Sequence, residues 1–449
     1  MASAAQSMHS ARPTVRNPDT SSREVMTARA WWLVALNVLI PGSAQMLAGN
    51  RRLGRFGVSA TFVLWAVALL VLVVYLIDST VLLTLATNPI ALTVGQVLLG
   101  AYAVLWVVLT LDALRLVRLV KASPGARPFL AGVAVVALVL TAGGAAYGAH
   151  LAGVARDAIV SVFQSGEYAE PVDGRYNILL LGGDAGADRE GLRPDSISVV
   201  SVDAETGATT IIGVPRNFER ATFSEGSPMF EAYPNGYDCG DECLISYLYT
   251  VGEENSELYP DAESKGSSAG LEAMRDAVEG VTGLHLHYYV LIDMHGFQHL
   301  IDALGGVEIE VPERLAYGPV TSPTPFGYFE AGPQRMNGEQ ALWYARSRFD
   351  GNDLERMERQ RQVQQAIITQ MEPTNVVSKF QAVADAGTQV VKTDIPDVMI
   401  GVFVDLAGKS REHAIATLEL VPDSGVDTVY PDYASIHAIV QDSLVQPAE

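Results

Sequence analysis

Arginine is concentrated in one short stretch of an otherwise acidic region of this 449-residue chain. Residues 151–449 carry 19 basic and 47 acidic residues, a formal charge of −28. Five of the basic residues fall within 16 positions: Arg346, Arg348, Arg356, Arg359 and Arg361. Because guanidinium groups bind phosphate oxygens through paired hydrogen bonds, this cluster indicates a site for an anion such as a phosphate. The negative charge of the surrounding region argues against nucleic-acid binding.

The spacing of these arginines indicates how they would be presented. Arg346 and Arg348 would project to one side of an extended segment, and Arg356 and Arg359 would share a helix face. If Asp353 caps that helix, Arg356 lies in its first turn, where free N–H groups and the helix dipole favour a phosphate. A plainer interpretation is that the arginines pair with neighbouring carboxylates on a solvated helix face, where such pairs contribute about 0 to 1 kcal/mol.

Charged residues also follow or precede apolar strands. The run Asn177–Leu181 leads through two glycines to Asp184, and Asp195 precedes the next apolar run. Loops at strand ends can bring two carboxylates together around a hard cation such as Mg²⁺, although both aspartates could be ordinary turn or cap residues. A third run, Thr209–Val214, ends beside Arg216, which places another bidentate donor at a strand end.

The elements that must position these residues alternate between two patterns. Short runs rich in branched residues predict four strands: Asn177–Leu181, Ile197–Val202, Thr209–Val214 and Tyr288–Ile292. Helical patterns cover three segments: Ser267–Val281, Phe297–Leu304 and Asp353–Met371. We therefore predict an α/β (α+β) sandwich with a central sheet flanked by helices. The polar, Pro- and Gly-rich residues 224–265 are typical of a long surface excursion.

The two cysteines of the chain, Cys239 and Cys243, lie four positions apart. In an oxidising compartment they favour a short-range disulfide, whose main effect would be to fix the shape of a five-residue loop. Free thiols are the second interpretation. A zinc site is the least favoured one, because it needs two further ligands and the nearest histidine is His285.

The first 150 residues are apolar and carry 11 basic and 4 acidic residues, a formal charge of +7. Phe56–Ile77, Ile90–Leu111 and Phe129–Ala149 each supply the roughly 20 apolar residues that a membrane-spanning helix needs. A cleaved signal peptide fits poorly, because a polar tail precedes the first apolar run and further runs follow. Buried core helices are disfavoured by the number of such runs. The pattern therefore predicts a multi-pass membrane region.

The basic residues predict its orientation. Asp78–Pro89 has no lysine or arginine, whereas the next connection, Arg115–Arg127, has four basic residues, so this second connection is expected in the cytoplasm. The chain after about residue 150 is then extracytoplasmic. Trp31–Gly49 is flanked by arginines and interrupted by Pro41 and Gly42, which favours a re-entrant or interfacial segment over a fourth span.

Taken together, the outer segments resemble the LytR-CpsA-Psr family of cell-wall glycopolymer ligases. The residues that carry the resemblance are NILLLGGD, RPDSISVVSVD, IIGVPRN, DALGGVEIEVP and QALWYARSRFDGNDLERMERQ, in the family's order, from about Tyr176 to Gln360. The resemblance implies an enzyme that transfers a glycopolymer from a polyprenyl-diphosphate-linked donor to peptidoglycan through a phosphodiester. A polyprenyl-diphosphate hydrolase and a noncatalytic wall-polymer-binding scaffold are the alternatives.

The resemblance also assigns site residues. Asp184 and Asp195 match aspartates associated with Mg²⁺. Five arginines match those that bind the diphosphate: Arg193, Arg216, Arg346, Arg348 and Arg356. Asp353 and Gln360 match polar residues of the same pocket. The implied partners are the polyprenyl-diphosphate-linked glycopolymer, peptidoglycan and membrane lipid, without nucleic acid.

In the implied reaction, negative charge grows on the departing polyprenyl phosphate, and a metal ion with several arginines would stabilise it. Catalysis is assigned to Arg193, Asp195 and Asp353, with either aspartate as the proton acceptor for the attacking hydroxyl. One position departs from the family's pattern, because Asn217 follows Arg216 where the family usually has an aspartate. Asn217 retains a hydrogen-bond acceptor but lacks the charge.

The expected organisation has four parts: a cytoplasmic tail (1–30), a membrane region (31–150, with segment 31–49 and spans at about 56–77, 90–111 and 129–149), a linker (151–175) and the catalytic domain (176–449). The chain is expected to be a multi-pass protein of the cell membrane.

The lipid tail of the donor also needs shelter. Apolar faces of Leu271–Val281 and Phe297–Leu304 would line such a slot, or they form ordinary core.

Overall fold

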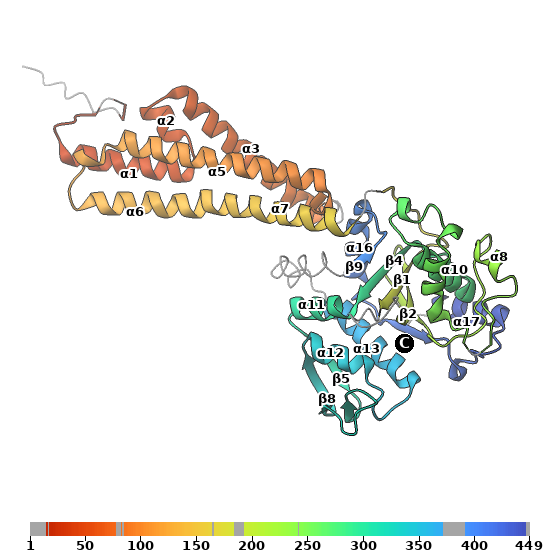
Figure 1. Cartoon of the computed structure of the whole chain (residues 1–449). Coiled ribbons are helices and arrows are strands. Elements are labelled where there is room, and N and C mark those ends of the chain that lie inside the picture. Colours follow the sequence, from red (N-terminus) through yellow and green to blue (C-terminus); the bar gives the residue numbers. More distant parts are fainter. Residues whose placement is uncertain are drawn as a thin grey trace, which may run out of the picture. The chain divides into compact units, whose positions relative to one another are not determined.

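The chain divides into two compact units, which are described separately. A computed structural model describes residues 15–16, 18–77, 82, 85–163, 166–183, 193–240, 242–370 and 391–445 (Figure 1). The N-terminal unit comprises residues 1–82 and 90–153, and the C-terminal unit comprises residues 83–89 and 154–449.

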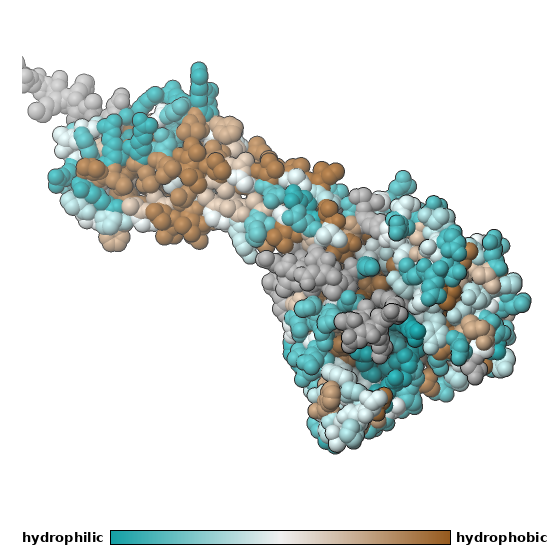
Figure 2. All heavy atoms as spheres, viewed as in Figure 1, coloured by the Kyte–Doolittle hydropathy of each residue, from teal (hydrophilic) through white to brown (hydrophobic). Residues whose placement is uncertain are grey.

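The N-terminal unit is helical. Its helices are α1 (Arg23–Leu39), α2 (Ser43–Ala48), α3 (Arg51–Ile77), α5 (Pro89–Val117), α6 (Ala126–Leu138) and the first part of α7 (Gly144–Val162). Among the described residues, three helical stretches are long and apolar enough to cross a membrane: Arg51–Ile77, Pro89–Lys121 and Ala126–Val162. Figure 2 shows apolar side chains over much of the surface of these helices. These stretches contain the three segments that the sequence predicts to span.

The first apolar segment is broken into two helices. α1 ends at Leu39, and Gly42 adopts a left-handed conformation (φ 94°) before α2 begins. A Cβ atom on Gly54 of α3 would lie 2.5 Å from the backbone nitrogen of Met46, so only glycine permits the close approach of α2 to α3. The break coincides with the Pro41–Gly42 pair, and placing this segment in a membrane stays a prediction.

The C-terminal unit is built on a six-stranded mixed sheet with strand order β10-β3-β2-β1-β4-β9. The strands are β1 (Arg175–Gly183), β2 (Pro194–Asp203), β3 (Thr209–Val214), β4 (Tyr288–Asp293), β9 (Val391–Thr393) and β10 (Ala416–Glu419). β1, β2 and β3 are antiparallel neighbours, whereas β4 runs parallel to β1 and β10 runs parallel to β3. The four predicted strands lie within β1 to β4.

Helices cover the sheet, as the sequence predicts. α10 (Ala269–Thr282), α9 (Leu248–Glu254) and α17 (Tyr433–Val445) share a core with β1 to β4, whereas α16 (Asp397–Ser410) packs against a separate cluster that includes Tyr176 and Tyr288. Residues 224–265 differ from the predicted surface excursion. They contain α8 (Met229–Ala232) and α9, and Met229, Ile245 and Leu248 are fully buried in the core.

A third cluster of buried residues lies beside the sheet. It joins helices α11 (Met294–Leu304), α12 (Gly338–Arg346) and α13 (Asp353–Gln370) to two small antiparallel pairs of strands. One pair is β5 (Val307–Val311) with β8 (Gly332–Met336), and the other is β6 (Leu315–Tyr317) with β7 (Gly327–Phe329). This cluster carries most of the arginines that the sequence singles out.

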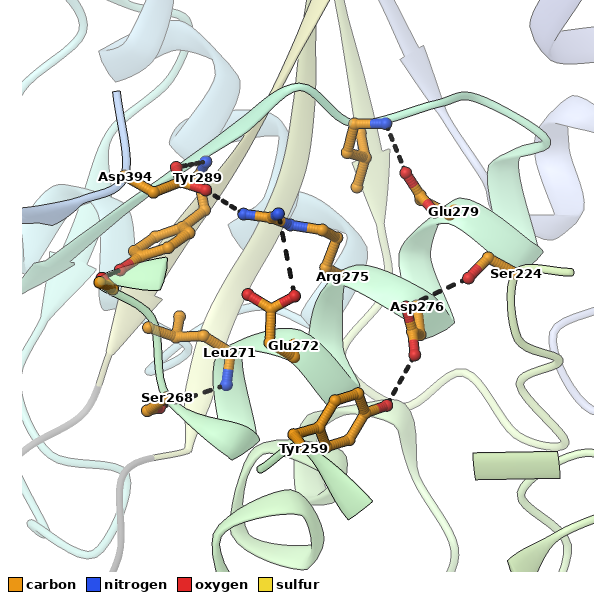
Figure 3. Close-up of polar contacts among 12 residues, drawn as sticks. Ser224, Tyr259, Ser268, Leu271, Glu272, Arg275, Asp276, Glu279, Tyr289 and Asp394 are labelled. Carbon is orange, nitrogen blue, oxygen red and sulfur yellow. Dashed lines mark hydrogen bonds and ion pairs between the residues drawn. The ribbon is translucent and has the colours of Figure 1, made fainter. Parts of the chain in front are cut away.

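A polar network connects α10 to the sheet (Figure 3). Arg275 pairs with Asp394 and lies 3.8 Å from a carboxylate oxygen of Glu272, while Asp394 accepts a hydrogen bond of 2.7 Å from the backbone N–H of Tyr289. Nearby, Asp276 accepts a 2.6 Å hydrogen bond from the hydroxyl of Tyr259. The charge of Arg275 is matched by two carboxylates, which indicates a structural network, although its Nε has no hydrogen-bond partner among the described residues.

Candidate functional site

The strand register brings the first two site residues together. β2 and β3 are antiparallel, with Ile197 opposite Val214, and the same register two residues further along brings Asp195 opposite Arg216. The Nη1 atom of Arg216 lies 2.5 Å from Oδ1 of Asp195. Burial alone would lower the pKa of Arg216, but Asp195 and Asp353 raise it above its ordinary value.

Asp353 is the centre of an arginine cluster. One carboxylate oxygen, Oδ2, lies 3.4 Å from Arg216 Nε and 3.0 Å from Arg356 Nη2, and Oδ1 lies 3.3 Å from Arg348 Nη1. The cap of α13 is Asn352, whose Oδ1 accepts the N–H of Glu355 at 3.0 Å. The condition that Asp353 caps this helix is therefore not met, but Arg356 still lies in the first turn, where its N–H donates to the carbonyl of Asn352 at 3.3 Å. Because Asn352 caps the helix, the Asp353 carboxylate binds guanidinium groups instead.

Arg356 is held in a buried position with too little negative charge around it. It is 4% exposed, and its Nε atom has no hydrogen-bond partner among the described residues. Burial, followed by the nearby charge of Arg216, lowers its pKa to about 10, although Asp353 opposes this effect. We call the five residues Asp195, Arg216, Arg348, Asp353 and Arg356 the site cluster. Its three cations face two carboxylates, so an anion would be stabilised there.

The plainer interpretation of the arginine stretch is therefore partly right. Arg348 and Arg356 do pair with a nearby carboxylate, but the pairing leaves positive charge in excess. Arg359 donates hydrogen bonds to the backbone carbonyls of Tyr344 and Ser347, and Arg361 pairs with Glu419 at 2.7 Å. These last two arginines are structural.

An apolar cavity of about 260 Å³ adjoins the site cluster. Six polar residues line it, and the rest of the lining is largely aliphatic; the polar residues are Asp195, Ser196, Asp293, Arg346, Gln360 and Gln364. It is lined by β1, β2, β4, α11, α12 and α13. The apolar faces of two helices were expected either to line such a slot or to form ordinary core. Phe297 and Leu300 of α11 line the cavity. The apolar face of α10, including Leu271 and Met274, instead belongs to the core.

Arg193 and Arg216 contact the segment that directly follows the disulfide loop. Cys239 and Cys243 form the disulfide that the sequence favours, with Cα atoms 5.3 Å apart. Just after this loop, the backbone N–H of Ser246 donates to the carbonyl of Arg216 at 3.3 Å, and the guanidinium of Arg193 lies 4.6 Å above the ring of Tyr247. Tyr247 is a functional candidate that the sequence reasoning missed. The only available signal was its place four residues after Cys243.

Two predicted residues contribute differently. Asp184 lies outside the described residues. Asn217 is exposed and makes no polar contact with Arg216 among the described residues, so Asp195 and Asp353 orient this arginine instead.

The donor set fits a magnesium ion that is shared with a phosphate ligand. Asp195 lines the cavity and uses Oδ1 for Arg216, whereas its Oδ2 makes no contact with another described residue. Asp353 engages both oxygens with arginine. The described residues contain no group of three potential metal ligands. Mg²⁺ usually binds one or two carboxylates and completes its coordination with phosphate oxygens and water, which Asp195 permits.

Comparison with known proteins identifies relatives. Residues 152–444 match the model of the LytR_cpsA_psr family. The chain is 28% identical over 303 residues to the cell wall biosynthesis protein LcpA of Corynebacterium glutamicum, covering 61% of this chain and 56% of LcpA. It is 28% identical over 225 residues to the polyisoprenyl-teichoic acid–peptidoglycan teichoic acid transferase TagU of Enterococcus faecalis, covering 49% of this chain and 61% of TagU. These alignments thus span less than two thirds of either relative.

Among solved structures, the crystal structure of Bacillus subtilis TagV is similar to this chain. The two share 24% identity with a TM-score of 0.43, and the match covers 60% of this chain and 97% of TagV.

Proposed function

The chain belongs to the LytR-CpsA-Psr family, and from this premise we propose that it transfers a glycopolymer from a polyprenyl-diphosphate-linked donor to peptidoglycan. The observation that carries the proposal is the site cluster, with its excess of positive charge, beside an apolar cavity of about 260 Å³. A polyprenyl diphosphate matches both features, because its apolar tail suits the cavity and is joined directly to a strongly anionic group that suits the site cluster. The names of the relatives, which include a teichoic acid transferase, support the same class of reaction.

The residues suggest how the transfer would proceed. The acceptor hydroxyl oxygen attacks the phosphorus that carries the sugar, and the bond to the bridging oxygen between the two phosphates breaks. The polyprenyl phosphate departs with the added negative charge. Arg216, Arg348 and Arg356 are positioned to stabilise that charge, and their pairing with Asp353 fixes their geometry before the donor binds.

The proton of the acceptor hydroxyl needs a base, and we assign this role to Asp195. Asp195 lines the cavity and has one carboxylate oxygen without a contact to another described residue. Asp353 is less suited, because both of its oxygens already accept hydrogen bonds from arginines. The same oxygen of Asp195 would alternatively hold a magnesium ion, which would add positive charge at the diphosphate, and the resemblance adds Asp184 to the ligands of that ion.

The three long apolar helices suggest where the reaction would take place. We propose that they span the cell membrane and that the C-terminal unit lies outside, where peptidoglycan is found. A membrane-linked donor would then remain in the bilayer while its diphosphate reaches the site cluster.

The test uses the full chain purified in detergent, with a polyprenyl-diphosphate-linked glycopolymer labelled in its sugar. We expect label to appear on added peptidoglycan, and we expect Asp195→Asn to abolish that transfer while the protein keeps its melting temperature. Release of free glycopolymer at the same rate with and without peptidoglycan would instead identify a hydrolase. Binding of the donor without release or transfer would identify a scaffold.

A further inference from the structure

The basic side chains of the N-terminal unit gather at one end of its helices. No lysine or arginine lies between Arg55, near the start of α3, and Arg115, near the end of α5. These two helix ends lie side by side, because a Cβ atom on Gly49, just before α3, would lie 2.7 Å from a methyl carbon of Leu116. Figure 2 shows hydrophilic surface at this end and apolar surface along the helices.

Helix α1 and the connection between α5 and α6 complete this end. The hydroxyl oxygens of Thr27 and Ser123 lie 2.9 Å apart, which holds the start of α1 against that connection. We define the basic end as six residues from three segments of the chain: Arg29, Arg51, Arg52, Arg115, Arg118 and Lys121. All of them except Arg29 are exposed.

Arg29 is buried without a carboxylate partner. It is 9% exposed, and its Nε and Nη1 atoms donate hydrogen bonds of 2.8 Å to the backbone carbonyls of Val15 and Leu116. Burial, followed by the nearby charge of Arg118, lowers the pKa of Arg29. Carbonyl groups satisfy the hydrogen bonds of a guanidinium but do not neutralise its charge, so the positive charge here is uncompensated.

The exposed members of the basic end are uncompensated as well. Within the described part of the chain, none of the six residues forms an ion pair with a carboxylate. Exposed arginines of the C-terminal unit differ, since Arg314 pairs with Glu330 and Arg335 pairs with Glu308. Several like charges held together on one surface repel one another, and a bound anion would relieve this repulsion.

The surroundings of the basic end indicate which anion it would bind. Trp31 and Trp32 follow Arg29 on α1 and are 41% and 66% exposed. Exposed tryptophan beside an apolar helix surface is typical of the boundary between a bilayer and water. A ligand at this boundary therefore has a charged group for the basic end and an apolar part for the helices.

Resting on the membrane placement proposed above, we propose that the basic end binds the headgroups of anionic phospholipids in the leaflet at this end of the helices. The headgroup phosphodiester supplies the negative charge that the described residues lack, and the acyl chains pack on the apolar helix surface. Inorganic phosphate shares the charge but has no apolar part, so it should bind more weakly.

The test uses the full chain in detergent, with short-chain phosphatidylglycerol and phosphatidylcholine as probes in titration calorimetry. We expect phosphatidylglycerol to bind more tightly and its binding to weaken as salt is added. The triple variant Arg115→Gln, Arg118→Gln and Lys121→Gln should raise the Kd for phosphatidylglycerol by about 10- to 100-fold, because each basic side chain at a membrane surface adds to the attraction. Its Kd for phosphatidylcholine should stay unchanged.

The matched control is the triple variant Arg314→Gln, Arg335→Gln and Lys409→Gln. It removes the same formal charge from the C-terminal unit, where each of these side chains pairs with a carboxylate, and it should keep the wild-type Kd values. Equal affinity of the wild type for the two lipids, an unchanged Kd in the first variant, an equal loss in the control, or displacement of phosphatidylglycerol by equimolar inorganic phosphate would each overturn the proposal.

The membrane placement is tested separately by flotation of the chain with phosphatidylcholine vesicles. Failure to float would contradict that placement. Flotation without any preference for phosphatidylglycerol would contradict only the binding of anionic lipid by the basic end.

Discussion

Two clusters in the C-terminal unit pair arginine with carboxylates, and they differ in which charge is in excess. The site cluster has three arginines and two aspartates. The network on α10, which we call the helix cluster, has Arg275 with Glu272 and Asp394. Burial would lower the pKa of Arg275, but Asp394 and Glu272 raise it above its ordinary value, whereas the pKa of Arg356 falls to about 10.

The difference separates a structural cluster from one suited to a ligand. In the helix cluster one arginine is paired with two carboxylates, so no excess positive charge is left for an anionic ligand. In the site cluster three arginines share two aspartates, and one of these aspartates, Asp195, lines the cavity. An arginine is thus a better indicator of function when its surroundings fail to neutralise it than when it simply belongs to a dense ion-pair network.

The largest expected effect is on the stability of the protein and comes from a change in the helix cluster. Arg275→Met should lower the free energy of unfolding by about 3 to 5 kcal/mol, because Asp394 is left buried without its cation. Urea unfolding followed by circular dichroism measures this change. At a temperature where the variant is still folded, its kcat should match that of the wild type. A large fall in kcat for folded Arg275→Met would remove the distinction between the clusters.

Arg216→Ala should lower the transfer rate and leave the stability of the protein nearly unchanged. We expect the transfer rate to fall by about 10²- to 10³-fold, the cost typical of losing one donor to a developing oxyanion. Stability should change little, since the loss of an ion pair is offset by reduced repulsion from Arg356. The assay is transfer of labelled glycopolymer to peptidoglycan, with a thermal melt as the control. Near-normal transfer would contradict the assignment.

Binding of pyrophosphate should distinguish the clusters without requiring catalysis. At a concentration of 100 Kd, pyrophosphate should stabilise the wild-type chain by about 2.7 kcal/mol. Arg275→Met should keep this gain, and Arg356→Met should lose most of it, as measured by the shift of the melting temperature. Repeating the titration with and without Mg²⁺ tests the proposed metal. An equal shift in both conditions would count against magnesium at this site.

The smallest expected effect concerns the disulfide loop. Replacing both Cys239 and Cys243 by serine should lower stability by about 2 kcal/mol, the entropy expected for a five-residue loop. Transfer should fall less than in Arg216→Ala, because the backbone bond between Ser246 and Arg216 remains available. Chemical denaturation and the transfer assay measure the two effects. A loss of transfer as large as that of Arg216→Ala would show that the loop itself belongs to the catalytic site.

The sequence predicted the strands because local patterns determine them. Thr209–Val214, for example, is a β-branched and apolar run whose six residues are all buried in β3. Arg216, Arg348 and Arg356 could be selected by their motifs, but their common partner could not. The resemblance placed Asp353 in the same pocket, but the sequence does not show that its carboxylate joins three arginines while Asn352 caps α13.

Other features depend on long-range packing that a single sequence does not report. The 224–265 region looked like a surface loop by composition, yet Met229 and Leu248 enter the core. The ring of Tyr247 lies under the guanidinium of Arg193 because the segment after the disulfide packs beside Phe218, where the N–H of Ile245 donates to the carbonyl of Phe218. The roles of Arg359 and Arg361 were equally hidden, because backbone carbonyls and Glu419, 58 residues away, receive their hydrogen bonds.

The way in which the site cluster is assembled has a consequence for folding. Asp195 and Arg216 are 21 residues apart, but Asp353 lies 137 residues beyond Arg216. Closing contacts of that separation is slow in comparison with forming a local hairpin. A chain that ends before α13 lacks both Asp353 and Arg356, so the site cluster is incomplete until this helix has been added. We therefore expect the full affinity of the site cluster for an anion to appear only when the fold is nearly complete.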